Sequence, residues 1–102
     1  MKFGLKEDII KKIRKVFSEF PEINEAVLYG SRAKKNFRPG SDIDITLKGE
    51  ELNLNKLNQI SIKLDDLLLP YIFDLSLFHH IKNSELLEHI HRAGVLFYKK
   101  KK

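Results

Sequence analysis

The sequence predicts one α/β or α+β domain around a small sheet, and two observations lead to this prediction. Short apolar runs with the two-residue period of strands alternate along the chain with longer segments whose apolar residues recur at helical spacing. The chain has 102 residues, which is room for one domain, and it contains no internal repeat or linker. We expect this domain to span residues 1–98 and a disordered lysine tail to follow at residues 99–102.

The first part of the chain predicts a helix that leads into the first of four strands. Isoleucine, valine and phenylalanine residues at helical spacing predict a helix from Leu5 to Phe20, which Pro21 ends. A turn is expected at residues 38–41, where a proline and a glycine can set the backbone angles. The strands are expected near residues 25–29, 42–48, 71–78 and 95–98.

The later part of the chain predicts two more helices. Regularly spaced leucine and isoleucine residues place them near residues 53–68 and 83–93. Asn53 and Ser84 are expected to cap their N-termini, because a side-chain oxygen there can accept a hydrogen bond from a free backbone N–H group. Gly94 suits the C-terminal end of the last helix. Three helices and four strands in alternation give the mixed fold class.

Two carboxylates in the second predicted strand suggest a metal site. In residues 41–47 apolar and polar residues alternate, which is the period of a strand with one buried face. Asp42 and Asp44 therefore point the same way, with Cα atoms about 6.6 Å apart. At an effective dielectric constant of about 20 their charges repel by about 2 to 3 kcal/mol, and a cation between them removes this penalty. Carboxylate oxygens without a nearby cysteine suit Mg²⁺ or Mn²⁺ better than a closed zinc site.

An isolated pair of this kind is most often a solvated strand face, but a second feature precedes it. The apolar run at residues 27–29 is followed directly by Gly30 and Ser31, as if a strand turned into a helix. A glycine lets an anion approach the backbone, and a serine hydroxyl can cap the helix or hold a phosphate oxygen. Alone, a glycine followed by a serine would most often be a turn. Next to the two carboxylates it predicts a phosphate site.

Basic residues follow the glycine and serine. They are either surface charges of an exposed loop or, for some of them, contacts to a triphosphate. We include Arg32 with Gly30 and Ser31 as predicted nucleotide-binding residues. The basic residues of this stretch are Arg32, Lys34, Lys35 and Arg38.

A third carboxylate lies in the predicted strand at residues 71–78, where Asp74 is the only charge. An ionised carboxylate in an apolar strand is unfavourable unless it is paired or coordinated. Asp74 therefore either lies at a strand end in water or joins the metal cluster. Three carboxylates from two strands can hold two metal ions and leave an oxygen near an attacking hydroxyl, which suits nucleotidyl transfer. We predict Asp42, Asp44 and Asp74 as the catalytic and metal-binding residues.

The chain resembles the minimal nucleotidyltransferases (MNT domains) of the DNA polymerase β superfamily, in particular those encoded beside HEPN-type partners. The family's glycine-serine pair, ten-residue spacer and aspartate-x-aspartate fall on Gly30, Ser31, Asp42 and Asp44. Its third aspartate, on a later strand, falls on Asp74. The resemblance covers nearly the whole chain. It departs from the family pattern at one position of the phosphate loop, where Lys35 stands in place of a common glycine.

This resemblance implies a nucleotidyltransferase fold with a small mixed four-stranded sheet and packed helices. It implies transfer of a nucleoside monophosphate, AMP from ATP, with two Mg²⁺ or Mn²⁺ ions and release of pyrophosphate. The implied acceptor is a tyrosine of a HEPN-type toxin encoded nearby, so that the chain acts as an antitoxin. Asp74 would bind one metal and help to deprotonate the acceptor. The alternative is a non-catalytic nucleotide-binding module that neutralises or assists a partner subunit by docking.

Composition narrows the class of protein further. The chain has no cysteine, which excludes disulfides and thiolate metal sites. No apolar stretch approaches the length of a membrane span, and the N-terminus lacks the features of a signal peptide. We therefore expect a cytoplasmic protein without a membrane partner.

The net charge of +5 does not by itself predict nucleic-acid binding. Four of the 19 lysines and arginines lie at residues 99–102, and the remaining 15 nearly balance the 14 acidic residues. We therefore expect no direct binding of nucleic acid by the folded part. The paired histidines do not predict a zinc site either, because His89 and His91 would point about 200° apart on a helix. Surface or partner-contact roles are left open for them.

Overall fold

Four strands form one mixed sheet in the computed structural model, which describes residues 2–101. The sheet order is β3-β2-β1-β4. β1 pairs antiparallel with both β2 and β4, whereas β2 and β3 are parallel. The predicted α+β fold with a small mixed four-stranded sheet is thus confirmed. The strands are β1 (Glu25–Tyr29), β2 (Ile43–Lys48), β3 (Phe73–Leu77) and β4 (Val95–Lys99).

The three predicted helices are present with slightly shorter bounds, and two short elements are added to them. A single helical turn, α2, follows β1 directly, and a 3₁₀ turn, η1, follows β3. Among residues 2–101 no helix has the length and hydropathy that crossing a bilayer requires. The helices are α1 (Glu7–Ser18), α2 (Ser31–Lys34), α3 (Leu54–Asp65), η1 (Phe78–His80) and α4 (Ser84–Ala93).

The helix caps follow the sequence with one correction. Asn53 caps α3 as predicted, because its side-chain oxygen accepts a hydrogen bond from the Lys56 N–H at 2.8 Å. The cap of α4 is Asn83 rather than Ser84. The Asn83 side chain accepts from the Leu86 N–H at 3.0 Å, and Ser84 is the first helical residue. Both residue types cap helices well, so the sequence alone did not separate two neighbouring candidates.

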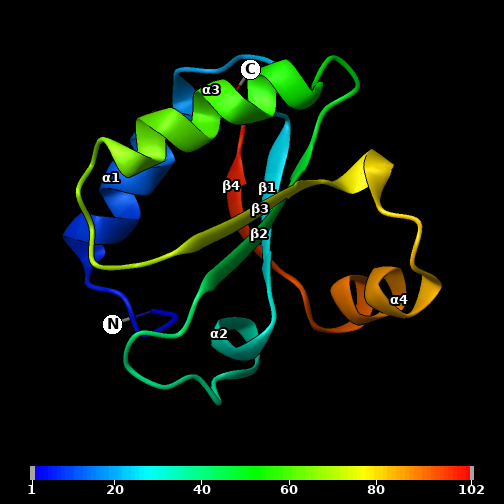
Figure 1. Cartoon of the computed structure of the whole chain (residues 1–102). Coiled ribbons are helices and arrows are strands. Elements are labelled where there is room, and N and C mark those ends of the chain that lie inside the picture. Colours follow the sequence, from blue (N-terminus) through cyan, green and yellow to red (C-terminus); the bar gives the residue numbers. More distant parts are fainter. Residues whose placement is uncertain (1, 102) are drawn as a thin grey trace.

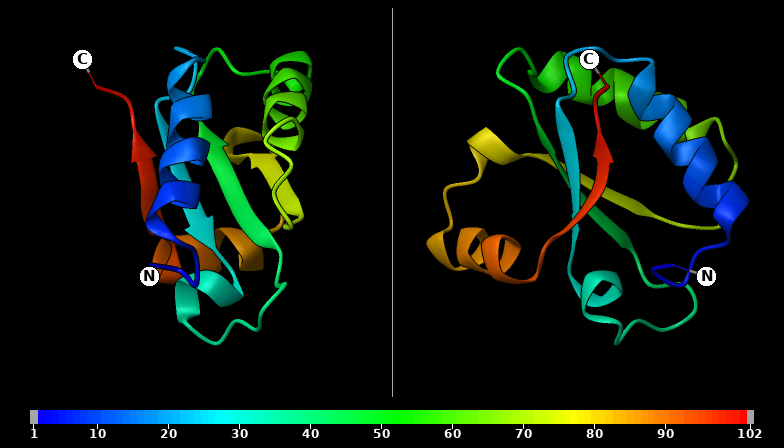
Figure 2. Two further views of the ribbon diagram at one scale, coloured as in Figure 1. Left: turned by 90° about the vertical axis from the view of Figure 1, so that its left-hand side faces the viewer. Right: turned by 180° about the vertical axis from the view of Figure 1, so that it is seen from behind.

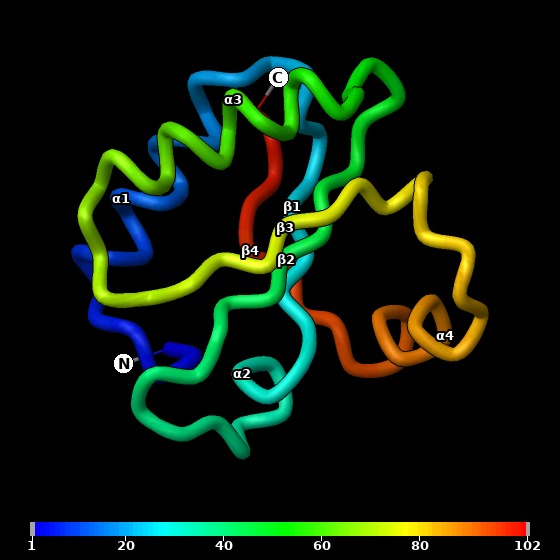
Figure 3. Tube along the Cα trace, in the orientation of Figure 1, coloured from blue at the N-terminus to red at the C-terminus, as the bar shows by residue number. Residues whose placement is uncertain are grey.

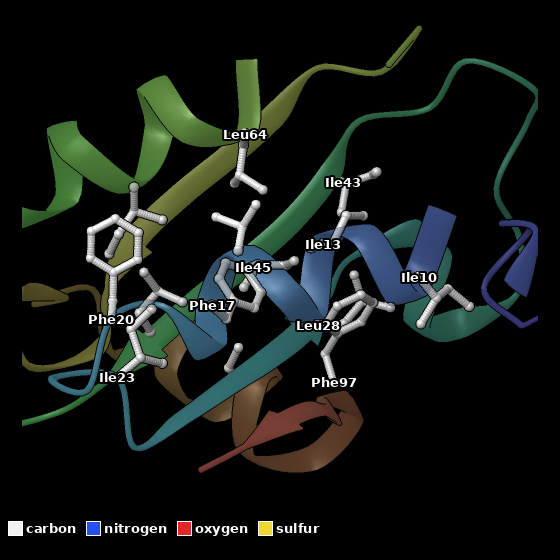
Figure 4. Packing of buried hydrophobic residues seen from close by; sticks show 14 of the residues in the cluster. Ile10, Ile13, Phe17, Phe20, Ile23, Leu28, Ile43, Ile45, Leu64 and Phe97 are labelled. Carbon is white, nitrogen blue, oxygen red and sulfur yellow. The ribbon is translucent and has the colours of Figure 1, made fainter. Parts of the chain in front are cut away.

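The main core lies between one face of the sheet and the helices α1 and α3 (Figures 1 and 2). α1 has a buried apolar stripe at helical spacing, and the inward residues of the strands alternate with outward ones. Figure 4 shows these side chains interlocking between the helices and the sheet. The central members of the cluster include Ile10, Ile13, Phe17, Leu28, Ile43, Ile45, Leu64 and Phe97.

The other face of the sheet is only partly covered. A second, smaller cluster joins Val27, Tyr29 and Ile90, with residues of α4 and the loop before it packed around them. In Figure 1, α4 lies on the opposite side of the sheet from α1 and α3. Polar residues of β2 and β3 occupy the remainder of this face, so the fold leaves a polar area beside α4.

The parallel pairing of β2 and β3 depends on α3. Two parallel strands cannot be joined by a hairpin, and the chain instead crosses over the core face through α3 before it returns as β3 (Figure 3). This crossover sets the register in which Asp44 lies opposite Asp74.

The lysine-rich end of the described chain is more ordered than predicted. Lys99 is the last residue of β4 and pairs with Glu25. The Lys100 N–H donates to the Asn24 carbonyl at 2.9 Å, and its Nζ donates to the Pro21 carbonyl at 2.9 Å. The prediction of a disordered tail from residue 99 is therefore wrong for these two lysines, because β4 continues to pair with β1 beyond the apolar run. Residue 102 lies outside the described residues.

The departure from the family pattern at Lys35 has a structural consequence. Lys35 ends α2 with φ 66° and ψ 19°, the left-handed conformation that a glycine adopts more easily. We expect Lys35→Gly to raise the free energy of unfolding by up to about 1 kcal/mol, since the left-handed penalty exceeds the extra entropy of glycine in the unfolded chain. Urea denaturation measures this change. Lys34→Gly, inside the helical turn, is the control and should lower the free energy of unfolding. If Lys35→Gly lowered it by as much as Lys34→Gly does, the expectation would be contradicted.

Candidate functional site

Tyr29, Asp44 and Asp74 form a row across the three strands β1, β2 and β3. Asp44 lies opposite Tyr29 in the antiparallel pair and opposite Asp74 in the parallel pair. Residues that face each other across a ladder project from the same side of the sheet, and neighbouring strands are about 4.8 Å apart. The three side chains therefore share the partly covered face, with both carboxylates near the start of their strands.

The charges of the three predicted carboxylates affect one another. Burial raises the pKa of the Asp44 carboxyl, the charge of Asp74 raises it further, and that of Asp42 adds a smaller rise in the same direction. Arg32 opposes this shift. Asp42, which directly precedes β2, and Asp74 are exposed, whereas Asp44 is half-buried. The structure thus places the three residues near one another at one end of the sheet.

The donor set fits a hard divalent cation. All three side chains offer carboxylate oxygens, and a cation would offset the repulsion that raises the pKa of Asp44. Within residues 2–101, however, no three acidic or histidine side chains are close enough together to hold a metal ion as they stand. The site therefore has the ligands for Mg²⁺ or Mn²⁺ but not a closed coordination shell.

Gly30 brings the predicted phosphate loop against the carboxylates. It has φ 79° and ψ −154°, a region of backbone conformation that is essentially restricted to glycine. A Cβ atom added at this position would overlap Oδ2 of Asp44. Only glycine therefore fits between β1 and α2 while Asp44 keeps its place. Ser31, the first residue of α2, follows directly and is half-buried.

His89 of α4 is a site residue that the sequence did not identify. The Gly30 N–H donates a hydrogen bond to His89 Nε2 at 3.2 Å, with this nitrogen as the acceptor. The imidazole also packs edge-on to the Tyr29 ring, with ring centroids 6.3 Å apart. The available signal was helical spacing, because residue 89 shares a helix face with Leu86 and Ile90, which pack on Tyr29. His91 points elsewhere and is exposed.

Arg32 lies in a different environment from the one predicted for a nucleotide contact. It is only 2% exposed. Its Nε and Nη2 donate to the Ser41 carbonyl at 3.1 and 2.8 Å, and its Nη1 donates to the Phe3 carbonyl at 2.8 Å. The guanidinium also lies over the rings of Phe37 and Tyr71. Arg32 thus fixes the backbone that leads into the first aspartate, whereas the other basic residues of the loop are exposed.

Tyr29, which lies next to Asp44 in this row, is a neutral group. Burial raises the pKa of its phenol, and the charges of Asp74 and Asp44 raise it further, while the neighbouring Ser76 hydroxyl partly offsets the rise. Ser76 Oγ is buried and has no partner in hydrogen-bond geometry among the described residues, so its contact with Tyr29 is looser than a hydrogen bond. The β1 end of the row therefore adds no charge to that of the carboxylates.

Comparison with known proteins identifies the family and supports the fold. The family described as polymerase β, nucleotidyltransferase, matches residues 11–102. A search of the curated proteins finds no match. The structure of a toxin–antitoxin with AMP-PNP is similar, with a TM-score of 0.72 and 21% identity over 90% of this chain and 74% of that chain.

Two other solved structures share the fold. The complex of tri-AMPylated Shewanella oneidensis HEPN toxin with MNT antitoxin has a TM-score of 0.68 and 19% identity, over 94% of this chain and 74% of that chain. The toxin–antitoxin MntA–HepT has a TM-score of 0.68 and 20% identity, over 93% of this chain and 74% of that chain. At these identities the likeness establishes the fold.

Proposed function

The chain belongs to the polymerase β nucleotidyltransferase family, and on this premise we propose that it transfers AMP from ATP to a tyrosine hydroxyl of a HEPN-type toxin and so acts as an antitoxin. The observation that carries the proposal is the alignment of Asp44 with Asp74 beside the glycine-only turn at Gly30. Structural neighbours that pair an MNT antitoxin with an AMPylated HEPN toxin support the choice of acceptor.

Each residue of the site has a role in this proposal. Gly30 lets the terminal phosphates approach the turn, and Ser31 receives them through its hydroxyl and its backbone N–H. His89 holds the Gly30 N–H in place. Arg32 positions the turn before β2 through its bonds to backbone carbonyls, and this replaces the nucleotide contact expected from the sequence. The partly open face beside α4 leaves room for an acceptor from another chain.

The carboxylates hold the metal ions and move the proton. Asp42, Asp44 and Asp74 would bind Mg²⁺ or Mn²⁺, two ions being the expected number, and the bound ions supply positive charge against the triphosphate. Exposed Asp74 accepts the proton of the incoming hydroxyl. The acceptor oxygen then bonds to the α-phosphorus, the bond from this phosphorus to the β-phosphate oxygen breaks, and pyrophosphate leaves with that electron pair.

One observation favours the second candidate function, a non-catalytic module that docks on a partner. As they stand, no three acidic or histidine side chains within residues 2–101 form a group that could hold a metal ion. A docking module needs no such convergence. The two functions differ in whether a partner tyrosine gains AMP.

The deciding experiment mixes the protein with a HEPN-type partner, ATP and Mg²⁺ and looks for AMP on partner tyrosines by mass spectrometry. The expected result is AMP addition that is lost in the Asp74→Asn variant. If the wild type adds no AMP but neutralises the partner as well as the Asn variant does, the docking function replaces the transfer function.

Nucleotide binding should depend on the divalent metal. Because the three carboxylates repel the triphosphate without a cation, we expect EDTA to lower the affinity for ATP by at least about tenfold relative to Mg²⁺ or Mn²⁺, a change of about 1.4 kcal/mol. Titration calorimetry measures this. Asp44→Asn is the control, since it should narrow the difference between metal and EDTA. Equal affinity of the wild type under both conditions would contradict the metal assignment.

A further inference from the structure

A basic groove lies between α1 and the edge strand β4. Its volume is about 810 Å³, and none of the three site carboxylates lines it. Figure 2 shows α1 next to β4 at this edge of the sheet. No acidic side chain among residues 2–101 lines the groove. Its basic lining residues are Lys11, Arg14, Lys15, Lys99, Lys100 and Lys101.

Two parts of the chain that are far apart in sequence bring these charges together. Lys11 and Lys15 are four residues apart on α1 and therefore lie on one side of the helix. Pairing of β4 with β1 carries Lys99 along the same edge, and the bond from Lys100 to Asn24 extends it. Three of the four lysines that the sequence assigned to a solvated tail, Lys99, Lys100 and Lys101, thus form one wall of a groove. The nearly balanced charge of the rest of the chain does not reveal this local excess of positive charge.

The open edge of β4 is not available for an additional peptide strand. Phe97 is the extra residue of an irregularity in the pairing of β4 with β1. Its carbonyl accepts a hydrogen bond from Arg14 Nε at 2.8 Å, and the guanidinium lies 5.3 Å from the Phe97 ring centroid. An acidic peptide that paired with this edge would have to displace Arg14. The groove therefore favours a ligand that is recognised by its charges rather than by backbone pairing.

We propose that the groove binds the phosphodiester backbone of a single-stranded nucleic acid, separately from the transfer reaction. Lysine and arginine side chains neutralise phosphates and release their counterions, which gives a salt-dependent affinity. Leu96, half exposed, and Tyr98, half-buried, also line the groove and offer apolar and aromatic surface to unstacked bases. Surfaces that bind single-stranded nucleic acid usually combine basic side chains with aromatic ones.

The test compares two double variants of equal net charge. Lys11→Glu with Lys15→Glu reverses two groove charges, whereas Lys12→Glu with Lys63→Glu reverses two exposed charges outside the groove. Binding of fluorescent single-stranded RNA and DNA oligonucleotides is measured by anisotropy between 50 and 200 mM salt. The double variant at Lys11 and Lys15 should bind the oligonucleotides at least about tenfold more weakly than the wild type. Its plot of log affinity against log salt concentration should be shallower by about 0.7 for each phosphate that the protein no longer neutralises. The outside pair should bind nearly as the wild type does.

Three outcomes would overturn the proposal. Equal losses of affinity in both double variants would show that only net charge matters. Wild-type affinity in the variant at Lys11 and Lys15 would place the ligand elsewhere. Displacement of the oligonucleotide by polyglutamate of equal charge at equal concentration would identify an acidic protein as the ligand. Circular dichroism checks that each variant is folded. If the reversed charges disturb α1, the double variant Lys11→Ala with Lys15→Ala replaces them in the same test.

Discussion

Asp44→Asn is expected to stabilise the folded protein and to abolish most of its transfer activity. Asp44 lies between Asp42 and Asp74, and burial together with these two charges raises the pKa of its carboxyl. The ionised form is therefore disfavoured in the folded state without a cation. Asparagine keeps the size of the side chain and removes the charge. The same change removes a predicted metal ligand, so we expect transfer to fall by at least about a hundredfold.

The pH dependence gives the sign of the stability effect. A carboxyl group whose pKa is raised by folding favours the fold in its neutral form. This contribution is fully present below the ordinary pKa of 3.8 and is lost as the pH rises through the higher pKa of the folded state. The variant has no such loss. Its advantage in free energy of unfolding should therefore be small below the ordinary pKa, grow as the pH rises, and level off above the folded-state pKa.

Urea denaturation at several pH values, without divalent metal, measures the gain in stability of Asp44→Asn. AMP incorporation measures its loss of transfer activity. Asp65→Asn, at the exposed end of α3, is the matched control and should leave transfer unchanged. A variant that is less stable than the wild type at neutral pH would contradict the electrostatic picture of the site. A variant that retains full transfer would remove Asp44 from the catalytic residues.

Local sequence patterns predicted the parts of the site that depend on spacing along one strand or turn. The alternation around Asp42 and Asp44 predicted two neighbouring carboxylates, and in the structure their charges do act on each other. Gly30 was predicted to allow close approach of an anion, and the structure adds that its backbone conformation is essentially restricted to glycine. The order of helices and strands followed from the two periods. These features depend on a few consecutive residues, so they can be inferred without knowledge of the neighbouring chain segments.

Features that depend on distant segments were predicted only in part. The lone charge of Asp74 in an apolar strand suggested that it joins the other carboxylates, but its position opposite Asp44 depends on the parallel register set by the crossover through α3, which no local period encodes. In the sequence Arg32 does not differ from the other basic residues of the loop, but in the structure it contacts the Phe3 carbonyl and two aromatic rings. His89 acquired its partner, the Gly30 N–H, only through the packing of α4 on β1. Long-range packing decides between several roles that one residue type can take.

Gly30→Ala is expected to damage both the fold and the site, for two separable reasons. The backbone at φ 79° and ψ −154° is essentially restricted to glycine, and an alanine there costs about 1 to 3 kcal/mol. The added Cβ would also overlap Asp44 Oδ2 and push the carboxylate away from its place. Gly40→Ala is the control for a positive-φ glycine without overlap, since Gly40 has φ 85° and its added Cβ would meet no atom within 4 Å.

A double-mutant cycle separates the overlap from the strain. In an Asp44→Ala background the overlapping oxygen is gone and the remaining Cβ atom of residue 44 lies 3.6 Å from the added Cβ, an ordinary contact. Gly30→Ala should therefore destabilise this background by about 1 kcal/mol or more less than it destabilises the wild type. Urea denaturation of the four proteins gives the coupling energy. Equal losses in both backgrounds would show that Asp44 does not press against Gly30, and the phosphate loop and the carboxylates would then be independent parts of the site.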